Sequence, residues 1–220
     1  MRKILGLWHS TLGKKVVMGV TGLIMIGFLV MHMLGNLQAF AGAAKLDAYA
    51  ALLHGPLHEV VLLTRGVLLA AVVLHIVAAY QLTMLDRAAR PVAYARKVPQ
   101  AATLASRTLR VGGVLLLVFI VFHLLHFTVG SVHPAFIEGS VYHNLVSGLS
   151  RPVVGLFYIL AMLSLGLHLY HGAWSSFRTL GLSQTSPHPL QRPVALGLAV
   201  VLWLGFTAIP VAVLLGWLHE

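Results

Sequence analysis

Residues 16–38 read VVMGVTGLIMIGFLVMHMLGNLQ, a run without a single charged side chain. A helix needs roughly 20 apolar residues to cross the hydrocarbon of a bilayer, because each residue advances about 1.5 Å. Four further apolar runs of similar length lie at about 60–85, 109–130, 152–176 and 194–217. This pattern predicts an all-α membrane protein with five transmembrane helices in a bundle.

The composition of the 220 residues supports this class. Hydrophobic residues make up 59% and charged residues 9%, against about 25% charged in an average soluble domain. The absence of cysteine excludes thiolate-bound iron–sulfur clusters, covalent c-type haem and disulfides within the chain. The net charge of +10 lies mostly between the apolar runs, so we expect no nucleic-acid partner. The first run is too long for a signal peptide, and no cleavage site follows Asn36. We expect a single membrane domain over residues 1–220.

The basic residues predict the orientation of the spans. One set of segments is rich in them: Arg2, Lys3, Lys14, Lys15, Arg87, Arg90, Arg96, Lys97, Arg107, Arg110, Arg178 and Arg192. The opposite segments hold fewer and add acidic residues: Lys45, Asp47, Glu59, Glu138 and Arg151. The positive-inside rule therefore predicts a cytoplasmic N-terminus and an external C-terminus. The two external segments, 39–59 and 131–151, are long enough for short surface helices.

Each of the first four spans contains a histidine near its middle or outer half: His32, His75, His123 and His168. An imidazole without a partner is costly in hydrocarbon. One histidine in each of four successive spans therefore indicates a common purpose.

Helical rise predicts how these histidines pair. His75 lies about 16 Å from the inner end of its span, and His168 lies about 15 Å from the inner end of its own. His32 and His123 lie higher, at about 25 and 20 Å. We therefore expect a lower pair of His75 with His168 and an upper pair of His32 with His123. Two haems, each bound from both faces by neutral imidazole, would use all four.

Two further histidines leave alternatives open. His126 and His171 each follow a predicted ligand by three residues, on roughly the same helix face. His126, at about 24 Å from the inner end of its span, matches the depth of His32 better than His123 does. Helix tilt blurs such a difference. Glycines near the sites either give room for a porphyrin or let helices pack closely: Gly22, Gly27, Gly35, Gly112, Gly113, Gly166 and Gly172.

Several ordered motifs carry a resemblance to a known family. The first is Ser10-Thr-Leu-Gly-Lys-Lys15, followed by Gly22 and by FLVMHMLGNL at residues 28–37. Then come FHLLHF at 122–127, HLYHGAWS at 168–175 and Thr-Leu-Gly at 179–181. In order and spacing along nearly the whole chain, they resemble the single-chain, five-helix, dihaem cytochrome b anchor of succinate:quinone oxidoreductases, meaning succinate dehydrogenase or fumarate reductase.

The resemblance implies two haems b, an outer one on His32 and His123 and an inner one on His75 and His168. It implies a flavoprotein subunit and an iron–sulfur subunit as partners, and a membrane quinone, often menaquinone in this type. The chain itself would transfer electrons and bind quinone, without binding the dicarboxylate. Its location would be the prokaryotic cytoplasmic membrane, with the basic segment 87–110 either seating the iron–sulfur subunit or only setting topology.

Quinone chemistry moves protons, so ionisable and hydroxyl groups near a haem are candidates for its site. On the outer side these are His54, His58, Glu59, Tyr142 and His143, and on the inner side His9, Ser10, Lys14 and Trp174. Candidate partners of the haem propionates are Arg65, Arg151 and Arg178. Arg65 is set inside an apolar run, and its other interpretation is a side chain that extends to the outer interface. Some family members carry a glutamate two residues before the fourth-span ligand, where this chain has Gly166.

Two other functions remain open at this point. One is the cytochrome b anchor of a hydrogenase or formate dehydrogenase, which spacing alone does not separate. A cytochrome bc type is disfavoured because no span carries two ligands 13 or 14 residues apart. The other is a haem-free, histidine-rich metal or proton transporter, although the deep part of each span lacks acidic residues.

Overall fold

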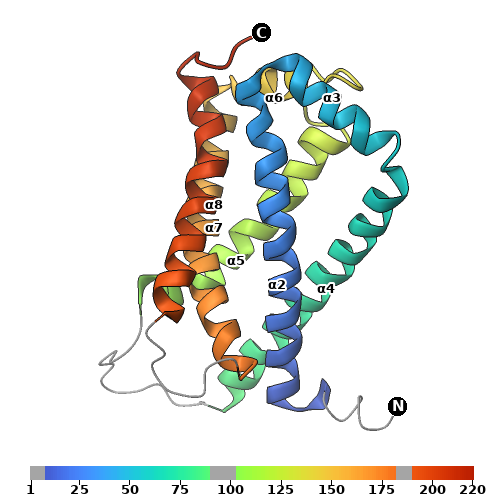
Figure 1. Ribbon diagram of the computed structural model, residues 1–220. Coiled ribbons are helices and arrows are strands. Elements are labelled where there is room, and N and C mark those ends of the chain that lie inside the picture. The colour runs from blue at the N-terminus through green and yellow to red at the C-terminus, as the bar shows by residue number, and fades with distance from the viewer. Residues whose placement is uncertain (1–7, 90–102, 182–189) are drawn as a thin grey trace.

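The computed structural model describes residues 8–89, 103–181 and 190–220, and the regular secondary structure in these ranges is helical (Figure 1). The long helices are α2 (Thr11–Asn36), α4 (His58–Ala88), α5 (Leu104–His123), α7 (Pro152–Thr179) and α8 (Gln191–Leu214). The short segments are η1 (Leu37–Ala41), α3 (Ala43–His54), the π-helical turn η2 (Leu124–Thr128) and α6 (Val141–Leu149).

Within the described ranges, five helices are long and apolar enough to cross a membrane, as the sequence predicts. Two of them begin several residues before their apolar runs, because a side chain caps each start. Ser10 Oγ accepts a hydrogen bond of 2.9 Å from the backbone N–H of Gly13. Thr103 Oγ1 accepts one of 3.2 Å from the N–H of Ser106. Each cap satisfies an N–H that has no partner inside the helix, so α2 and α5 extend into polar flanks.

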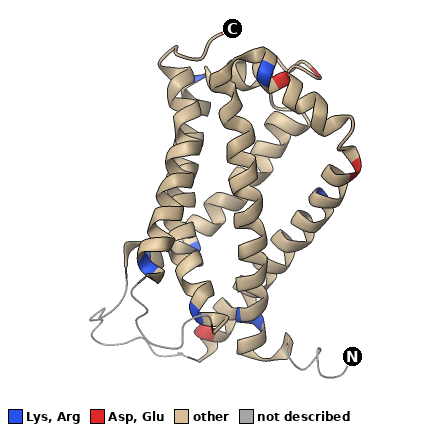
Figure 2. Cartoon of the chain, in the orientation of Figure 1, with Lys and Arg blue, Asp and Glu red and all other residues tan. Residues whose placement is uncertain are grey.

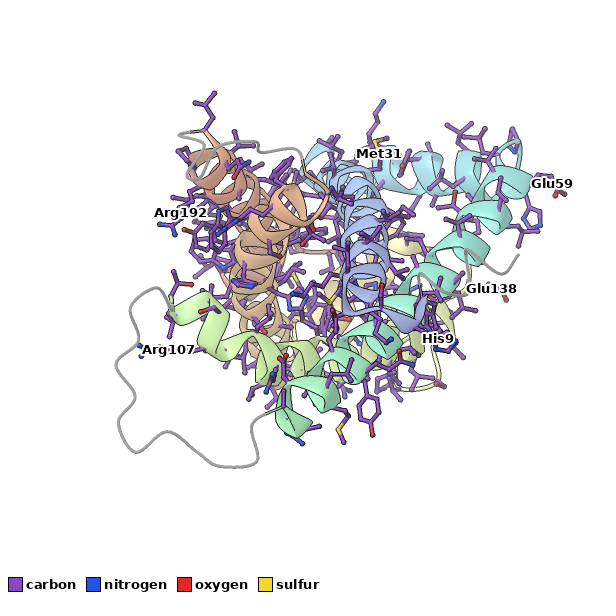
Figure 3. All side chains as sticks on the ribbon, turned by 90° about the horizontal axis from the view of Figure 1, so that it is seen from below. His9, Met31, Glu59, Arg107, Glu138 and Arg192 are labelled. Atoms are coloured by element: carbon purple, nitrogen blue, oxygen red, sulfur yellow. The ribbon has the colours of Figure 1, made fainter. Side chains whose placement is uncertain are left out.

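Helix α7 is the centre of the packing, since it contacts α8, α5 and α2, while α4 lies against α2 (Figure 1). Ala161 on α7 and Leu202 on α8 are fully buried. By contrast, Leu63 and Leu69 on α4 are 71% and 68% exposed, and Met31 projects outward from α2 (Figure 3). Large apolar side chains on the outside of apolar helices are covered by lipid in a bilayer. The chain is thus a multi-pass membrane protein by its helices and its surface.

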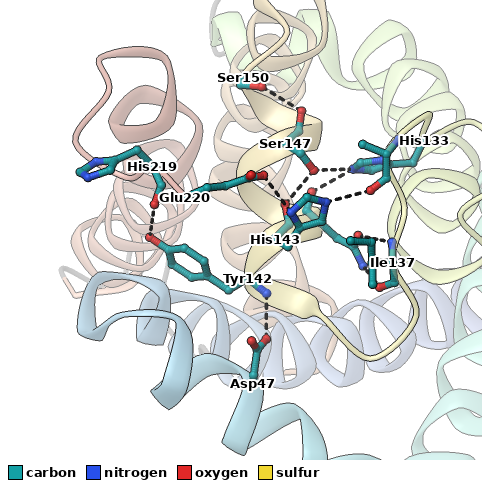
Figure 4. Close-up of polar contacts among 11 residues, drawn as sticks. Asp47, His133, Ile137, Tyr142, His143, Ser147, Ser150, His219 and Glu220 are labelled. Carbon is teal, nitrogen blue, oxygen red and sulfur yellow. Dashed lines mark hydrogen bonds and ion pairs between the residues drawn. The ribbon is translucent and has the colours of Figure 1, made fainter.

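One end of the structure is closed by α3, α6 and the C-terminal residues (Figure 1). Asp47 on α3 accepts a 2.9 Å hydrogen bond from the backbone N–H of Tyr142 on α6, and the Tyr142 hydroxyl donates to the carbonyl of His219 at 3.1 Å (Figure 4). His143 forms a 2.8 Å ion pair with Glu220. The prediction of short helices within 39–59 and 131–151 is confirmed.

Charge differs between the two ends of the described chain (Figure 2). The end at which α2, α5 and α8 begin carries Lys14, Lys15, Arg87, Arg107, Arg110, Arg178 and Arg192, with Asp86. Arg107 and Arg192 project outward there (Figure 3). The end closed by α3 and α6 carries Lys45, Arg65, Arg151, Asp47, Glu59, Glu138 and Glu220. The helices therefore bring the described basic residues of these segments to one end, while Arg2, Lys3, Arg90, Arg96 and Lys97 lie outside the described residues.

Candidate functional site

The lower histidine pair joins α4 to α7. The ring centres of His75 and His168 are 6.2 Å apart, with 53° between the ring planes. His75 Nδ1 lies 3.1 Å from the carbonyl oxygen of Met18 and 3.2 Å from Thr21 Oγ1. The Thr21 hydroxyl donates its own hydrogen to the carbonyl of Val17 at 2.7 Å, so its oxygen is available as an acceptor. Both contacts favour a hydrogen on Nδ1 of His75, which leaves the Nε2 lone pair free for a metal.

The upper pair joins α2 to the end of α5. The ring centres of His32 and His123 are 5.9 Å apart, and the ring planes are at 85°. Phe28 stacks on His32 at 5.2 Å, and Phe119 stacks on His123 at 5.7 Å. His123 Nδ1 lies 3.3 Å from the hydroxyl oxygen of Tyr158, again leaving its Nε2 free.

His32 differs from the other three histidines in its local partner. Its Nε2 lies 3.2 Å from the side-chain amide nitrogen of Asn36, one turn further along α2. An amide N–H donated to Nε2 occupies the lone pair that a metal would use. Binding of iron by His32 therefore requires this contact to open or the imidazole to turn.

The two ring separations suit a metal held between imidazoles. A metal–imidazole bond is about 2.0–2.1 Å, and the bound nitrogen lies about 1.2 Å from the ring centre, so two opposed ligands place their ring centres about 6.4 Å apart. The observed 6.2 and 5.9 Å are close to this value. Any twist between the rings is compatible, because each ring plane contains its own metal–nitrogen bond.

The two pairs lie at two different depths along the bundle, and the residue spacing on each of three helices gives the same separation between these depths. Gly22 on α2 borders the His75 ring, and Gly113 on α5 borders the His168 ring, since a Cβ at either position would lie 3.6 or 3.8 Å from the imidazole Cε1. His32 and His123 each follow their glycine by ten residues, and Tyr158 precedes His168 by ten. Ten residues correspond to about 15 Å of helix. Helices α2 and α5 thus offer a glycine at the lower level and a histidine at the upper.

The other glycines divide between the two roles that the sequence left open. A Cβ at Gly35 would lie 2.7 Å from the Tyr49 ring, and one at Gly112 would lie 2.9 Å from Ser164 Oγ. A Cβ at Gly166 would lie 3.3 Å from Trp203. These three positions serve close packing. Gly27 and Gly172 have no atom within 4 Å of such a Cβ in the described part of the chain.

The residues around the lower pair fit a haem. His168 Nδ1 is buried and has no hydrogen-bond partner among the described residues. A buried N–H or lone pair requires such a partner. An open pocket of about 340 Å³ lies beside it between α5 and α7, and its lining includes Arg107, Gly112 and Ser164. His75 and His168 would supply two imidazole nitrogens to a haem iron, and the pocket borders the His168 side of the pair.

The structure separates His126 and His171 from the facing histidines. His126, 2% exposed, is enclosed by Phe122, by the backbone at Gly148 and by His133, whose ring stacks on it at 4.7 Å. Its Nδ1 lies 3.1 Å from the Tyr158 hydroxyl. His123, not His126, therefore meets His32. His171 instead contacts the edge of Trp174 at 5.9 Å.

The outer quinone-site candidates lie apart from the upper pair. Glu59 and Arg65 are exposed near the start of α4, and His54 Nδ1 lies 2.9 Å from the carbonyl of Ala50 on its own helix. Tyr142 and His143 hold the C-terminal residues, as described above. Among the described residues, none of these side chains forms a hydrogen bond, ion pair or ring contact with His32 or His123.

Among the candidates at the basic end, Lys14 is 7% exposed and its Nζ donates to the carbonyl of Trp8 at 2.7 Å. Ser10 is the cap of α2. Trp174 lies between two guanidinium groups, with Arg178 at 5.5 Å and Arg192 at 4.9 Å from its ring centre. A buried lysine, an aromatic ring and two exposed arginines thus lie at the basic end of the described chain.

Sequence reasoning missed the supporting residues of both pairs. Tyr158 stood out only as an interruption of an apolar run, and Thr21 did not stand out at all. A hydroxyl inside an apolar helix needs a hydrogen-bond partner, which is the signal that could have singled out Tyr158. Comparison with protein-family models, with curated proteins and with solved structures finds no match.

Proposed function

We propose that this chain is the haem-b-containing membrane anchor of a succinate:quinone oxidoreductase. The observation that carries the proposal is the facing of His32 with His123 and of His75 with His168, at two levels about 15 Å apart along the helices. The four imidazoles would hold the haems, two for each haem. When bound, the haems supply one-electron transfer between an iron–sulfur subunit and a membrane quinone, with menaquinone as the expected quinone.

The chain's own residues have distinct tasks in this proposal. Met18 and Thr21 hold the His75 ring with Nε2 free, and Tyr158 contacts the Nδ1 of His123. Apolar side chains on α2, α5 and α7 exclude water from both levels. The basic end faces the cytoplasm by the positive-inside rule and docks the iron–sulfur subunit, while the end with α3 and α6 faces outward. The flavoprotein subunit, which the chain does not contact in this proposal, holds the dicarboxylate.

The first test is a reduced-minus-oxidised absorption spectrum of the purified protein, with haem per chain counted as the pyridine haemochrome. We expect a b-type spectrum and two haems per chain. His171→Ala is the matched control, because it removes a histidine of the same span and should keep both haems. Folded, haem-supplied protein that binds none would overturn the proposal and favour the histidine-rich transporter.

A second test separates the possible complexes. In native membranes, succinate should reduce the haems of this chain. Added malonate, a dicarboxylate that competes with succinate, should abolish that reduction. Reduction by hydrogen or formate instead would assign the same dihaem anchor to a hydrogenase or a formate dehydrogenase. Each outcome names the partner enzyme through its electron donor.

A further inference from the structure

Tyr158 on α7 has a hydroxyl group shared by two histidines, His123 at the end of α5 and His126 in the π turn η2. The oxygen lies 3.3 Å from Nδ1 of His123 and 3.1 Å from Nδ1 of His126. Tyr158 is 7% exposed, so water does not compete at this depth. A phenol carries one hydrogen and can also accept, and it can therefore accept from one imidazole while donating to the other.

A local irregularity of the helix brings both histidines to this hydroxyl. Directly after His123 the backbone changes from α to π, and the N–H of Val129 bonds to the carbonyl of Leu124 at 2.9 Å, five residues earlier. A π turn is rare and occurs often at functional sites. It widens the turn that carries His126, so that His123 and His126 both direct Nδ1 toward Tyr158.

The direction of the hydrogen bonds follows from the role of His123. If Nε2 of His123 faces a metal, its Nδ1 carries the hydrogen and donates to the Tyr158 oxygen. The Tyr158 O–H is then free to donate to Nδ1 of His126. His126 is a neutral acceptor in this arrangement, with its hydrogen on Nε2.

The surroundings of His126 keep it in place for this task. The His133 ring stacks on it at 4.7 Å with 22° between the planes. His133 is itself held by the N–H of Ala135, which donates to Nδ1 at 3.2 Å, and by the carbonyl of Asn144, which accepts from Nε2 at 3.0 Å. Stacked rings direct their in-plane lone pairs side by side, so this pair supports His126 and does not converge on a metal.

We propose that Tyr158 is the positioning residue of the upper haem site, with His126 as the acceptor that orients its hydroxyl. The inference rests on the proposed function. Tyr158 holds the His123 ring through its Nδ1, which would leave Nε2 to bind the iron, and by accepting the Nδ1 hydrogen it would raise the electron density of that imidazole. A more electron-rich axial ligand favours ferric iron, so the loss of this hydrogen bond should raise the midpoint potential of the upper haem alone.

The test is a redox titration of purified Tyr158→Phe, with haem content and thermal unfolding measured on the same sample. We expect two haems and one midpoint potential shifted positively, by about 59 mV for a tenfold change in a one-electron equilibrium. The shifted wave should be the one that His32→Ala lacks. Tyr170→Phe, about 18 Å further along the same helix, is the control and should leave both potentials unchanged.

A second pair of variants decides the matter without Tyr158→Phe, should that protein fail to fold. His126→Leu removes the acceptor of the hydroxyl, whereas His126→Gln keeps an amide oxygen there. We expect the upper wave to shift in His126→Leu and to return toward wild type in His126→Gln. If wild-type protein binds two haems but none of these variants shifts either midpoint potential, the inference about Tyr158 is overturned and the proposed function stands. Wild-type protein without haem overturns the proposed function.

Discussion

The Nδ1 atom of His75 on α4 lies 3.1 Å from the carbonyl oxygen of Met18 on α2. This contact crosses between two helices, and it involves a carbonyl close to Thr21, whose hydroxyl lies near the same nitrogen. It orients one histidine of the lower pair before any ligand arrives. The bond to the backbone also means that no single side-chain substitution on α2 removes it.

Removal of either lower histidine should abolish one haem and spare the other. His75→Ala and His168→Ala each leave a single imidazole at the lower level, whereas the upper pair is about 15 Å away along the helices. We expect the haem content to fall from two to one per chain, with the same spectral component lost in both variants. Loss of both components from one substitution would contradict the independence of the two levels.

His123 and His126 should differ sharply when each is changed to alanine. His123→Ala removes the ring that meets His32 and should eliminate the upper haem. His126→Ala removes only the second neighbour of Tyr158 and should retain two haems with an altered spectrum. Haem counts of the two variants check this, and the reverse result would move the ligand to His126.

Bulk at the lower-level glycines should block the lower haem selectively. Gly22→Leu and Gly113→Leu place a side chain against the rings of His75 and His168, because a Cβ at these glycines would already lie 3.6 and 3.8 Å from the imidazole Cε1 atoms. Gly197→Leu on α8 is the control, because a Cβ there meets no described atom within 4 Å and this glycine belongs to neither histidine pair. We expect one haem per chain in the first two variants and two in the control; equal haem content in all three would show that the glycines do not border the haem.

Gly148 on α6 should be intolerant of even a methyl group. A Cβ there would lie 2.7 Å from His133 Nε2 and 2.8 Å from His126 Cε1, so both rings must shift. We expect Gly148→Ala to lower the free energy of unfolding by about 1–3 kcal/mol. Gly197→Ala, with open space at its Cβ, should be neutral or stabilising by up to about 1 kcal/mol. Thermal unfolding in detergent compares the two, and similar midpoints would argue against this packing.

The ion pair between Arg110 and Asp86 should matter little for stability. Its atoms are 3.0 Å apart, but the side chains are 57% and 71% exposed. Exposed pairs contribute about 0–1 kcal/mol because water and salt screen them. Asp86→Asn should therefore leave the unfolding midpoint close to wild type at moderate salt. A large decrease would indicate that the pair is covered by something absent from the isolated chain.

The sequence alone is enough to predict the five apolar helices, because crossing hydrocarbon requires a long apolar stretch with its backbone hydrogen bonds satisfied internally. It also determined the short helices at one end and the levels of the histidines. Helical rise alone matched His75 with His168 and brought His32 near the level of His123 and His126. These properties depend on composition and on distance along one helix axis.

Tertiary packing determines that His123 and not His126 faces His32, because depth carries no information on the direction in which a side chain points. That direction depends on how α5 is rotated against α2 and α7, and on the π turn that begins at Leu124. The packing likewise decided that Gly22 and Gly113 border the lower pair and that Tyr158 contacts the upper one. Contacts between helices arise from the fit of whole surfaces, which no local pattern in the chain encodes.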